Sequence, residues 1–187
     1  MLLSMSEGTP LMKRAAALIA CRAYSRGELR RRLATAQKAQ IAQDAQDTQN
    51  TQNADEIEAV LDRLEHLNLL NDAEYAYDFA LYRIKDSGWG EEKVLKALLD
   101  RDVSMAVADK ALERVREKST PEDVDSFDTA LMKYVEGYCR KHGTPSNSKA
   151  AQKLARRLTG RGFDEDRIVG ALERIISPDV FRDFTKF

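Results

Sequence analysis

Apolar residues recur along this chain at intervals of three and four positions, the spacing that places side chains on one face of an α-helix. Residues 164–176 carry one such stripe, and a second stripe lies in residues 57–67. The second stripe consists of Ile57, Val60, Leu61, Leu64 and Leu67. Both patterns predict amphipathic helices that turn one face toward a core.

Further signals mark where these helices begin and end. Thr-Pro pairs at residues 9–10 and 120–121 place a capping hydroxyl and a proline at helix starts. Ser25 and Glu28 have the spacing of a capping box. A glycine that directly follows a periodic segment is predicted to adopt a left-handed backbone conformation and so to end the helix. These glycines are Gly88, Gly143, Gly160 and Gly162.

The helical pattern occurs three times. The second and third sets of apolar positions stay in register at an offset of 60 residues. The first set is interrupted by extra residues and returns to the shared spacing at Ile57. The aligned positions are Leu29 and Leu33, then Val94, Leu98, Val103, Ala108 and Leu112, then Leu154, Leu158, Phe163, Ile168 and Leu172. We therefore expect an all-α fold, an elongated curved tandem of three three-helix units resembling helix-turn-helix repeats.

The repeat also predicts the domain organisation. We expect units at residues 9–68, 69–118 and 120–176, followed by a C-terminal tail at 177–187. Residues 37–54 interrupt the first unit with a Gln-rich stretch that has no aromatic residue and one branched aliphatic residue. Such a stretch has little apolar surface to offset the entropy lost on ordering. It predicts either a flexible insertion or an extended helix end.

Composition supports a helical chain. The 187 residues include 24 Ala and 20 Leu against 16 Val and Ile, with 9 Gly and 4 Pro. This balance excludes a β-sandwich or a doubly wound sheet.

Cys21 and Cys139 lack the spacing of a zinc site or a disulfide scaffold. No apolar run approaches the roughly 18 residues of a membrane span, so we expect a soluble, cytoplasmic protein without membrane contact.

The net charge of −1 hides strongly polarised stretches. Residues 11–40 hold eight basic residues against one acid, and residues 140–161 hold seven against none, so each stretch carries +7. Residues 41–80 hold ten acids against one arginine, a net of −9, which we attribute to ordinary helix solvation. Any single basic run is more often a solvated helix face. Two basic runs at equivalent repeat positions favour a stripe for a polyanion or an acidic protein surface.

Catalytic motifs are lacking. The sequence contains no phosphate-binding loop, dinucleotide fingerprint, zinc-protease helix or nucleophile elbow. His66 and His142 lie near predicted helix ends, where a cation complements the helix dipole. We therefore expect no enzyme, no cofactor and no metal site. Tyr82 has the helical spacing of a core residue, whereas Trp89 lies at a turn and is a candidate contact residue.

Three segments resemble the RecX regulatory proteins, which bind the filament of the RecA recombinase. Residues 17–34 (ALIACRAYSRGELRRRLA) resemble the opening signature of that family, a capped helix with a basic Leu-x-x-x-Leu core. Residues 67–99 resemble its central motif, which ends in Gly-Trp-Gly and the next helix. Residues 153–172 resemble its closing repeat. The family usually carries Pro and Arg after the second glycine, but this chain has acids at Glu91 and Glu92.

The resemblance implies a monomeric, non-enzymatic regulator that lodges in the groove of RecA on single-stranded DNA. It would inhibit filament extension, ATP hydrolysis and strand exchange, and so modulate recombination, DNA repair and the SOS response. Packing is expected from the aligned Leu pairs and Phe163. Contact roles with RecA or DNA are expected for Arg26, Arg30, Arg31, Arg32, Arg83, Lys85, Trp89, Lys149, Lys153, Arg156, Arg157 and Arg161.

Two other functions remain open from the residues alone. The basic stretches also suit a direct DNA-binding protein that uses its units like helix-turn-helix modules. Such a protein would bind DNA without RecA, and its affinity would fall steeply with salt. The third alternative is an adaptor solenoid for another helical partner.

Overall fold

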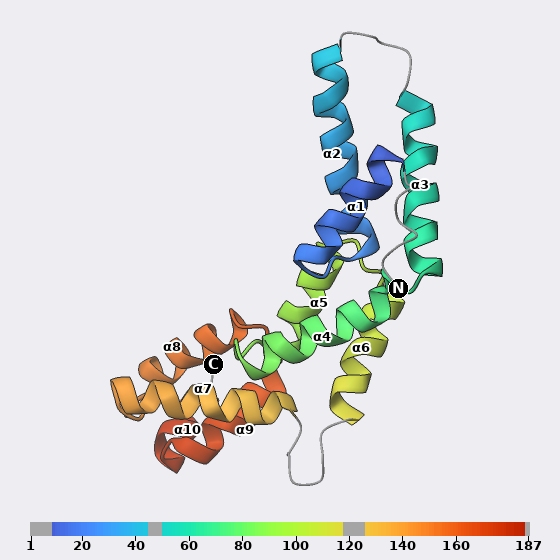
Figure 1. The fold of residues 1–187 in the computed structure, drawn as a ribbon. Coiled ribbons are helices and arrows are strands. Elements are labelled where there is room, and N and C mark those ends of the chain that lie inside the picture. The colour runs from blue at the N-terminus through green and yellow to red at the C-terminus, as the bar shows by residue number, and fades with distance from the viewer. Residues whose placement is uncertain (1–8, 45–49, 118–125, 186–187) are drawn as a thin grey trace.

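The structure is a computed structural model that describes residues 9–44, 50–117 and 126–185. Within those ranges the regular structure consists of helices (Figure 1). They are α1 (Pro10–Cys21), α2 (Arg26–Asp44), α3 (Asn50–His66), α4 (Asp72–Lys85), α5 (Glu91–Leu99), α6 (Met105–Glu117), α7 (Ser126–His142), α8 (Ser148–Thr159), α9 (Glu165–Ile175) and α10 (Pro178–Phe184). The predicted all-α fold is confirmed.

The first nine helices form three triplets, each built around its own apolar core. The predicted Leu pairs lie at the centres of the first and third cores, because Leu29, Leu33, Leu154 and Leu158 expose no surface. Phe163 is also buried, as expected. The domain boundaries at residues 68/69 and 118/120 stay a prediction about folding units.

Two of the predicted helix starts lie in the described residues. The Thr9 hydroxyl accepts a hydrogen bond from the backbone of α1, so this cap is confirmed. The Ser25 hydroxyl accepts from the backbone N–H of Glu28 at 3.1 Å, as in a capping box. The Glu28 carboxylate pairs with Arg22. The start predicted at residues 120–121 lies outside the described residues.

Left-handed glycines end three of the periodic segments. Gly88, Gly143 and Gly162 have φ angles of 59°, 79° and 85°, as predicted. The prediction was wrong for Gly160, whose φ of −64° is right-handed. The last turn of α8 continues through Gly160, and the left-handed residue comes two positions later at Gly162.

The Gln-rich segment extends two helices. Residues 37–44 continue α2, and residues 50–54 form the start of α3, because Gln and Ala both favour helix. Figure 1 shows α2 and α3 side by side, projecting from one end of the molecule as an arm. The extended-helix alternative is therefore correct for these residues. Residues 45–49 lie outside the described part of the chain.

The C-terminal segment also forms a helix that packs on the third triplet. Val180, Phe181 and Phe184 of α10 pack against the third core, and α10 lies along α8 and α9. The Ser148 hydroxyl at the start of α8 donates a hydrogen bond to the Asp183 carbonyl at 3.4 Å. Helix α10 thus covers the end of the tandem, where a further triplet would otherwise follow.

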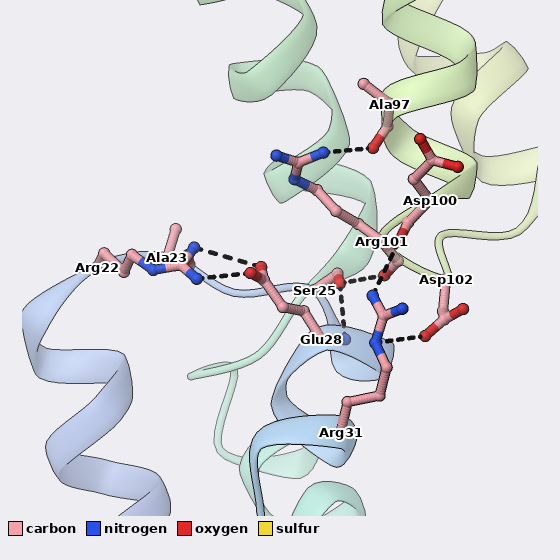
Figure 2. Close-up of polar contacts among 9 residues, drawn as sticks. All are labelled: Arg22, Ala23, Ser25, Glu28, Arg31, Ala97, Asp100, Arg101 and Asp102. Atoms are coloured by element: carbon pink, nitrogen blue, oxygen red, sulfur yellow. Dashed lines mark hydrogen bonds and ion pairs between the residues drawn. The ribbon is translucent and has the colours of Figure 1, made fainter. Parts of the chain in front are cut away.

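The junction between the first two triplets is polar. The Ser25 hydroxyl donates to the carbonyl of Arg101 at 2.6 Å (Figure 2). Arg31 donates to the Asp100 carbonyl at 2.9 Å and pairs with Asp102 at 3.1 Å. A Cβ atom added to Gly27 would lie 2.2 Å from the Asp102 Cβ. The turn before α6 therefore docks directly on the start of α2.

The second junction repeats this arrangement with backbone groups. The Gly90 N–H donates to the Arg161 carbonyl at 2.8 Å, and the Glu92 N–H donates to the Gly162 carbonyl at 3.1 Å. A Cβ on Gly90 would lie 2.2 Å from the Gly162 carbonyl carbon. Arg101 and Arg161 hold the same repeat position, and so do Ser25 and Gly90. Each of the first two triplets thus receives, at the start of its middle helix, the same turn of the next triplet.

Candidate binding surface

Three basic residues of the first triplet, Arg22, Arg26 and Arg30, are bound to carboxylates of the same triplet. The guanidinium of Arg26 on α2 lies 2.7, 2.7 and 2.6 Å from Glu58, Asp62 and Glu65 on α3. Arg30 pairs with Glu58 at 2.5 Å. The hydrogen bond from Arg30 lowers the pKa of the Glu58 carboxyl below its usual value, although burial opposes the shift. These contacts hold α2 against α3.

The acidic stretch of the first triplet is therefore not explained by solvation alone. Its carboxylates face the basic stretch across the α2–α3 interface, and this corrects the sequence-based interpretation. Arg31 is held at the junction by Asp102. Arg32 is exposed and, within the described residues, forms no ion pair. Of the four arginines predicted here as contact residues, Arg32 is the one whose charge stays unpaired.

In the second triplet, the predicted contact residues belong to a stack of cations and rings. The Arg83 guanidinium carbon lies 5.1, 5.6 and 4.7 Å from the ring centroids of Phe79, Tyr82 and Trp89. Lys93 lies 4.7 Å from the Trp89 ring. This stack joins α4 to the turn and start of α5. The expectation that Tyr82 is a core residue was wrong, because its side chain is 57% exposed.

The other residues of this region differ in exposure. Trp89 is half-buried between Arg83 and Lys93, whereas Lys85 is exposed near the end of α4. The Nε atom of Arg83 is buried and has no hydrogen-bond partner among the described residues. Arg83 therefore fills space between rings in this structure.

The exposed face of α8 carries unpaired positive charge. Helix α8 buries Ala151, Leu154 and Leu158 against the third core. Its cations lie on the exposed side, and none forms an ion pair with any residue in the described ranges. These cations are Lys149, Lys153, Arg156 and Arg157. The two stretches of +7 therefore differ in the folded chain, because the third triplet supplies no acids opposite α8 comparable to those opposite α2.

Arg161 connects the second and third triplets. Its Nη1 atom donates to the carbonyls of Ser87 and Gly88 at 2.9 and 3.1 Å. Its guanidinium carbon lies 4.0 Å from the ring centroid of Tyr134 on α7. This geometry predicts that Arg161 positions the junction beside Trp89.

Structure comparison shows what this arrangement is similar to. No family model matches the sequence, and no curated protein matches it. The crystal structure of RecX from Lactobacillus salivarius superposes with a TM-score of 0.67 at 18% identity, covering 88% of this chain and 93% of that chain. A crystal structure of the regulatory protein RecX superposes with a TM-score of 0.63 at 15% identity, covering 88% and 71%.

The chain has the RecX fold. At these identities the likeness concerns the fold and does not by itself assign the role of any side chain. The coverage of 88% nevertheless means that the tandem of helical triplets is a property of the RecX fold, as the sequence resemblance implied.

The sequence of this RecX-fold chain did not identify every residue of the candidate binding surface. Tyr134 and Tyr138 lie beside Arg161 and Arg157, but in the sequence they look like ordinary helix residues until α7 and the α8 segment are placed side by side. The sequence around Gly90 predicts only a turn, although Gly90 holds the same position in the second repeat as Ser25 holds in the first. That match is the one sequence signal that could have indicated a shared junction.

The remaining chemistry of the chain is limited. Across residues 9–44, 50–117 and 126–185, no three His, Cys, Asp or Glu side chains gather into a group able to hold a metal ion. Over the same ranges, no helix is both long and apolar enough to cross a membrane. The candidate site is therefore a charged and aromatic surface that spans the second and third triplets.

Proposed function

We propose that this chain is a non-enzymatic regulator that binds the RecA filament on single-stranded DNA. It inhibits filament extension, ATP hydrolysis and strand exchange, and so modulates recombination, DNA repair and the SOS response. The observation that carries the proposal is the RecX fold over 88% of the chain, together with three RecX-like segments in order. A bent tandem of helices with unpaired cations suits the groove of a polyanionic filament (Figure 1).

We divide the twelve predicted contact residues into two proposed groups. Five of them support the fold through ion pairs, cation–ring contacts or hydrogen bonds: Arg26, Arg30, Arg31, Arg83 and Arg161. The other seven offer charge or a ring to a partner: Arg32, Lys85, Trp89, Lys149, Lys153, Arg156 and Arg157. Charge reversal across Arg30 and Arg31 would also break the first junction, so the α8 cations give a cleaner test.

The test is RecA-catalysed ATP hydrolysis on single-stranded DNA while the chain is titrated in. We expect hydrolysis to fall as the chain is added. Reversal of Lys149, Lys153 and Arg156 to Glu should weaken inhibition several-fold, because it places negative charge toward the filament. Reversal of the exposed residues Arg63, Lys96 and Lys110 is the matched control. No inhibition by the unmodified chain at any ratio contradicts the proposal.

The alternative is a direct DNA-binding protein that uses its triplets like helix-turn-helix modules, which read duplex DNA. Its motivation was the pair of basic stretches, but Arg26 and Arg30 of the first stretch are paired with α3 carboxylates. Tight binding to duplex DNA, with no effect on RecA, would favour this alternative.

A further inference from the structure

Two tyrosines of α7 lie one helical turn apart, and each lies beside a cation of the α8 segment. The Arg161 guanidinium lies 4.0 Å from the Tyr134 ring centroid, and that of Arg157 lies 5.6 Å from Tyr138. The His142 ring lies 4.6 Å from Tyr138. Positions four apart share a helix face. The two α7 rings and the guanidinium groups of Arg157 and Arg161 therefore form two adjacent rows.

Further cations lie on α7 and α8, while Glu92, Asp164 and Glu165 line a pocket together with Arg156 of α8. Arg140 and Lys141 are exposed at the end of α7, near the exposed cations of α8. Glu136 is the only acid in the sequence from residue 129 to residue 163. It lies two positions from both tyrosines, which places it about 200° around the helix from their row. The row itself therefore lacks a neighbouring acid on its own helix.

The surface continues into the second triplet. Arg161 bonds to the carbonyls of Ser87 and Gly88, directly before Trp89. Trp89 in turn lies beside Arg83 and Lys93. Rings and cations therefore alternate across the second junction, from the end of α7 to the start of α5.

We infer that this α7–α8 surface binds single-stranded nucleic acid directly, with phosphates on the α8 cations and bases against Tyr134 and Tyr138. The inference rests on the proposed function and names which part of the filament this surface contacts. Proteins bind single strands by alternating cations and rings, because the backbone needs charge and the unpaired bases need a flat face. Bases can also stack on guanidinium planes, such as those of Arg157 and Arg161.

Other polyanions fit less well. The bases of a duplex are stacked on one another, so the half-buried tyrosines would add nothing to duplex binding. An acidic protein surface would use the cations, but the rings would contribute no specific contact. The alternation of rings and cations therefore favours the single strand.

The test is fluorescence anisotropy of a labelled oligothymidylate of about 15 nucleotides, a length in the usual range of single-strand sites, titrated with the full chain. The charge variant is Lys149→Gln, Lys153→Gln and Arg156→Gln. We expect binding to weaken about 10-fold or more, and the salt slope to fall by about 2, since each single-strand phosphate contact contributes about 0.7. The matched control, Arg63→Gln with Lys96→Gln and Lys110→Gln, should keep both values.

The tyrosines need a separate variant. Tyr134→Leu with Tyr138→Leu should weaken oligothymidylate binding about 100-fold, because each stacked base contributes about 10-fold. Tyr134→Phe with Tyr138→Phe should retain binding, since the ring is kept. Both tyrosines pack against the third core, so circular dichroism and melting accompany each measurement. If the Leu variant unfolds, the charge variant and the Phe variant still decide the question.

Three results would overturn the inference. In the first, the charge variant binds oligothymidylate as tightly as the unmodified chain. In the second, poly-glutamate displaces the labelled strand as effectively as unlabelled oligothymidylate does. In the third, the chain binds duplex DNA as tightly as single strands and the Leu variant has no effect. A chain that inhibits RecA but does not bind oligothymidylate removes this inference alone. A chain that binds oligothymidylate but leaves RecA unaffected removes the proposed function and leaves the surface assignment standing.

Discussion

Arg31 and Arg156 hold the same position in the repeat, yet their side chains have different neighbours. Arg31 pairs with Asp102, which the next triplet brings to the start of α2. Arg156 forms no ion pair among the described residues. Helix α10, and not the turn of a further triplet, packs against α8. A shared place in the repeat therefore predicts burial and helix geometry, while the fate of a charge depends on the neighbouring triplet.

The Glu58–Arg30 pair makes stability depend on pH in a definite direction. The pKa of Glu58 is lowered in the fold, so its contribution is present above the unfolded carboxyl pKa and is lost as pH falls through the folded value. We expect Glu58→Gln to lower the free energy of unfolding by about 0.5–1 kcal/mol at neutral pH. The difference from the unmodified chain should vanish at a pH below the folded pKa of Glu58.

Urea denaturation at neutral and acid pH measures this difference. Glu56→Gln is the control, because Glu56 is exposed on the same helix and shows no ion pair in the described structure. An equal loss for Glu58→Gln at both pH values would contradict the electrostatic explanation.

The two junctions join equivalent elements with different chemistry. Side chains of Ser25 and Arg31 link the first two triplets, whereas backbone N–H groups of Gly90 and Glu92 link the second and third. The second junction also shares a core, because Phe127 of α7 belongs to the core of the second triplet. The second junction is therefore the tighter of the two, and it carries the rings and cations of the proposed binding surface.

Gly90→Ala tests this close approach. Its Cβ would meet backbone atoms of Gly162 and Phe163, which cannot move aside like a flexible side chain. We expect a loss of about 2–3 kcal/mol in the free energy of unfolding. The single tryptophan, Trp89, should change its emission, since it lies directly before Gly90.

Gly137→Ala is the matched control within α7. Nothing lies within 4 Å of its added Cβ, so alanine should stabilise the helix by about 0.5–1 kcal/mol. Thermal unfolding of both variants gives the comparison. A Gly90→Ala variant as stable as the unmodified chain would show that the junction opens without cost.

The Gln-rich arm lies at the one helix turn that has no preceding triplet. In the second and third triplets, the corresponding turns at Arg101 and Arg161 dock on the middle helix before them. In the described residues no triplet precedes the first, so the outer ends of α2 and α3 have no such helix beside them. Extra residues can therefore lengthen both helices outward without disturbing a junction (Figure 1).

Replacement of residues 38–51 with a short Gly-Ser linker should leave a single cooperative unfolding transition with little change in Tm. The core of the first triplet uses Leu33 on α2 and Ile57 on α3, both outside the replaced range. Circular dichroism should show only the helix content of the arm lost. The same linker inserted between Gly160 and Arg161 should instead disrupt the second junction. Loss of cooperativity after the arm replacement would show that the arm packs on the body.

Much of the fold could be predicted because its information is local. The apolar spacing around Leu29, Leu98 and Leu154 depends on neighbours within two helical turns, and the burial of all three matches it. The binding surface could be predicted only in part. Tyr134 and Arg161 are far apart in sequence, so their contact appears only when α7 and the end of α8 are packed together.

The order of amino acids alone thus specified the helices, the threefold repeat and the stretches of like charge, because periodicity acts over a few residues. Tertiary structure decided which charges remain for a partner. Arg26 reaches acids on α3 that are more than thirty positions away, and such pairing depends on how helices pack rather than on local spacing. The contacts of Arg157 and Arg161 with the tyrosines of α7 are likewise a product of packing, since it placed α7 beside the α8 segment.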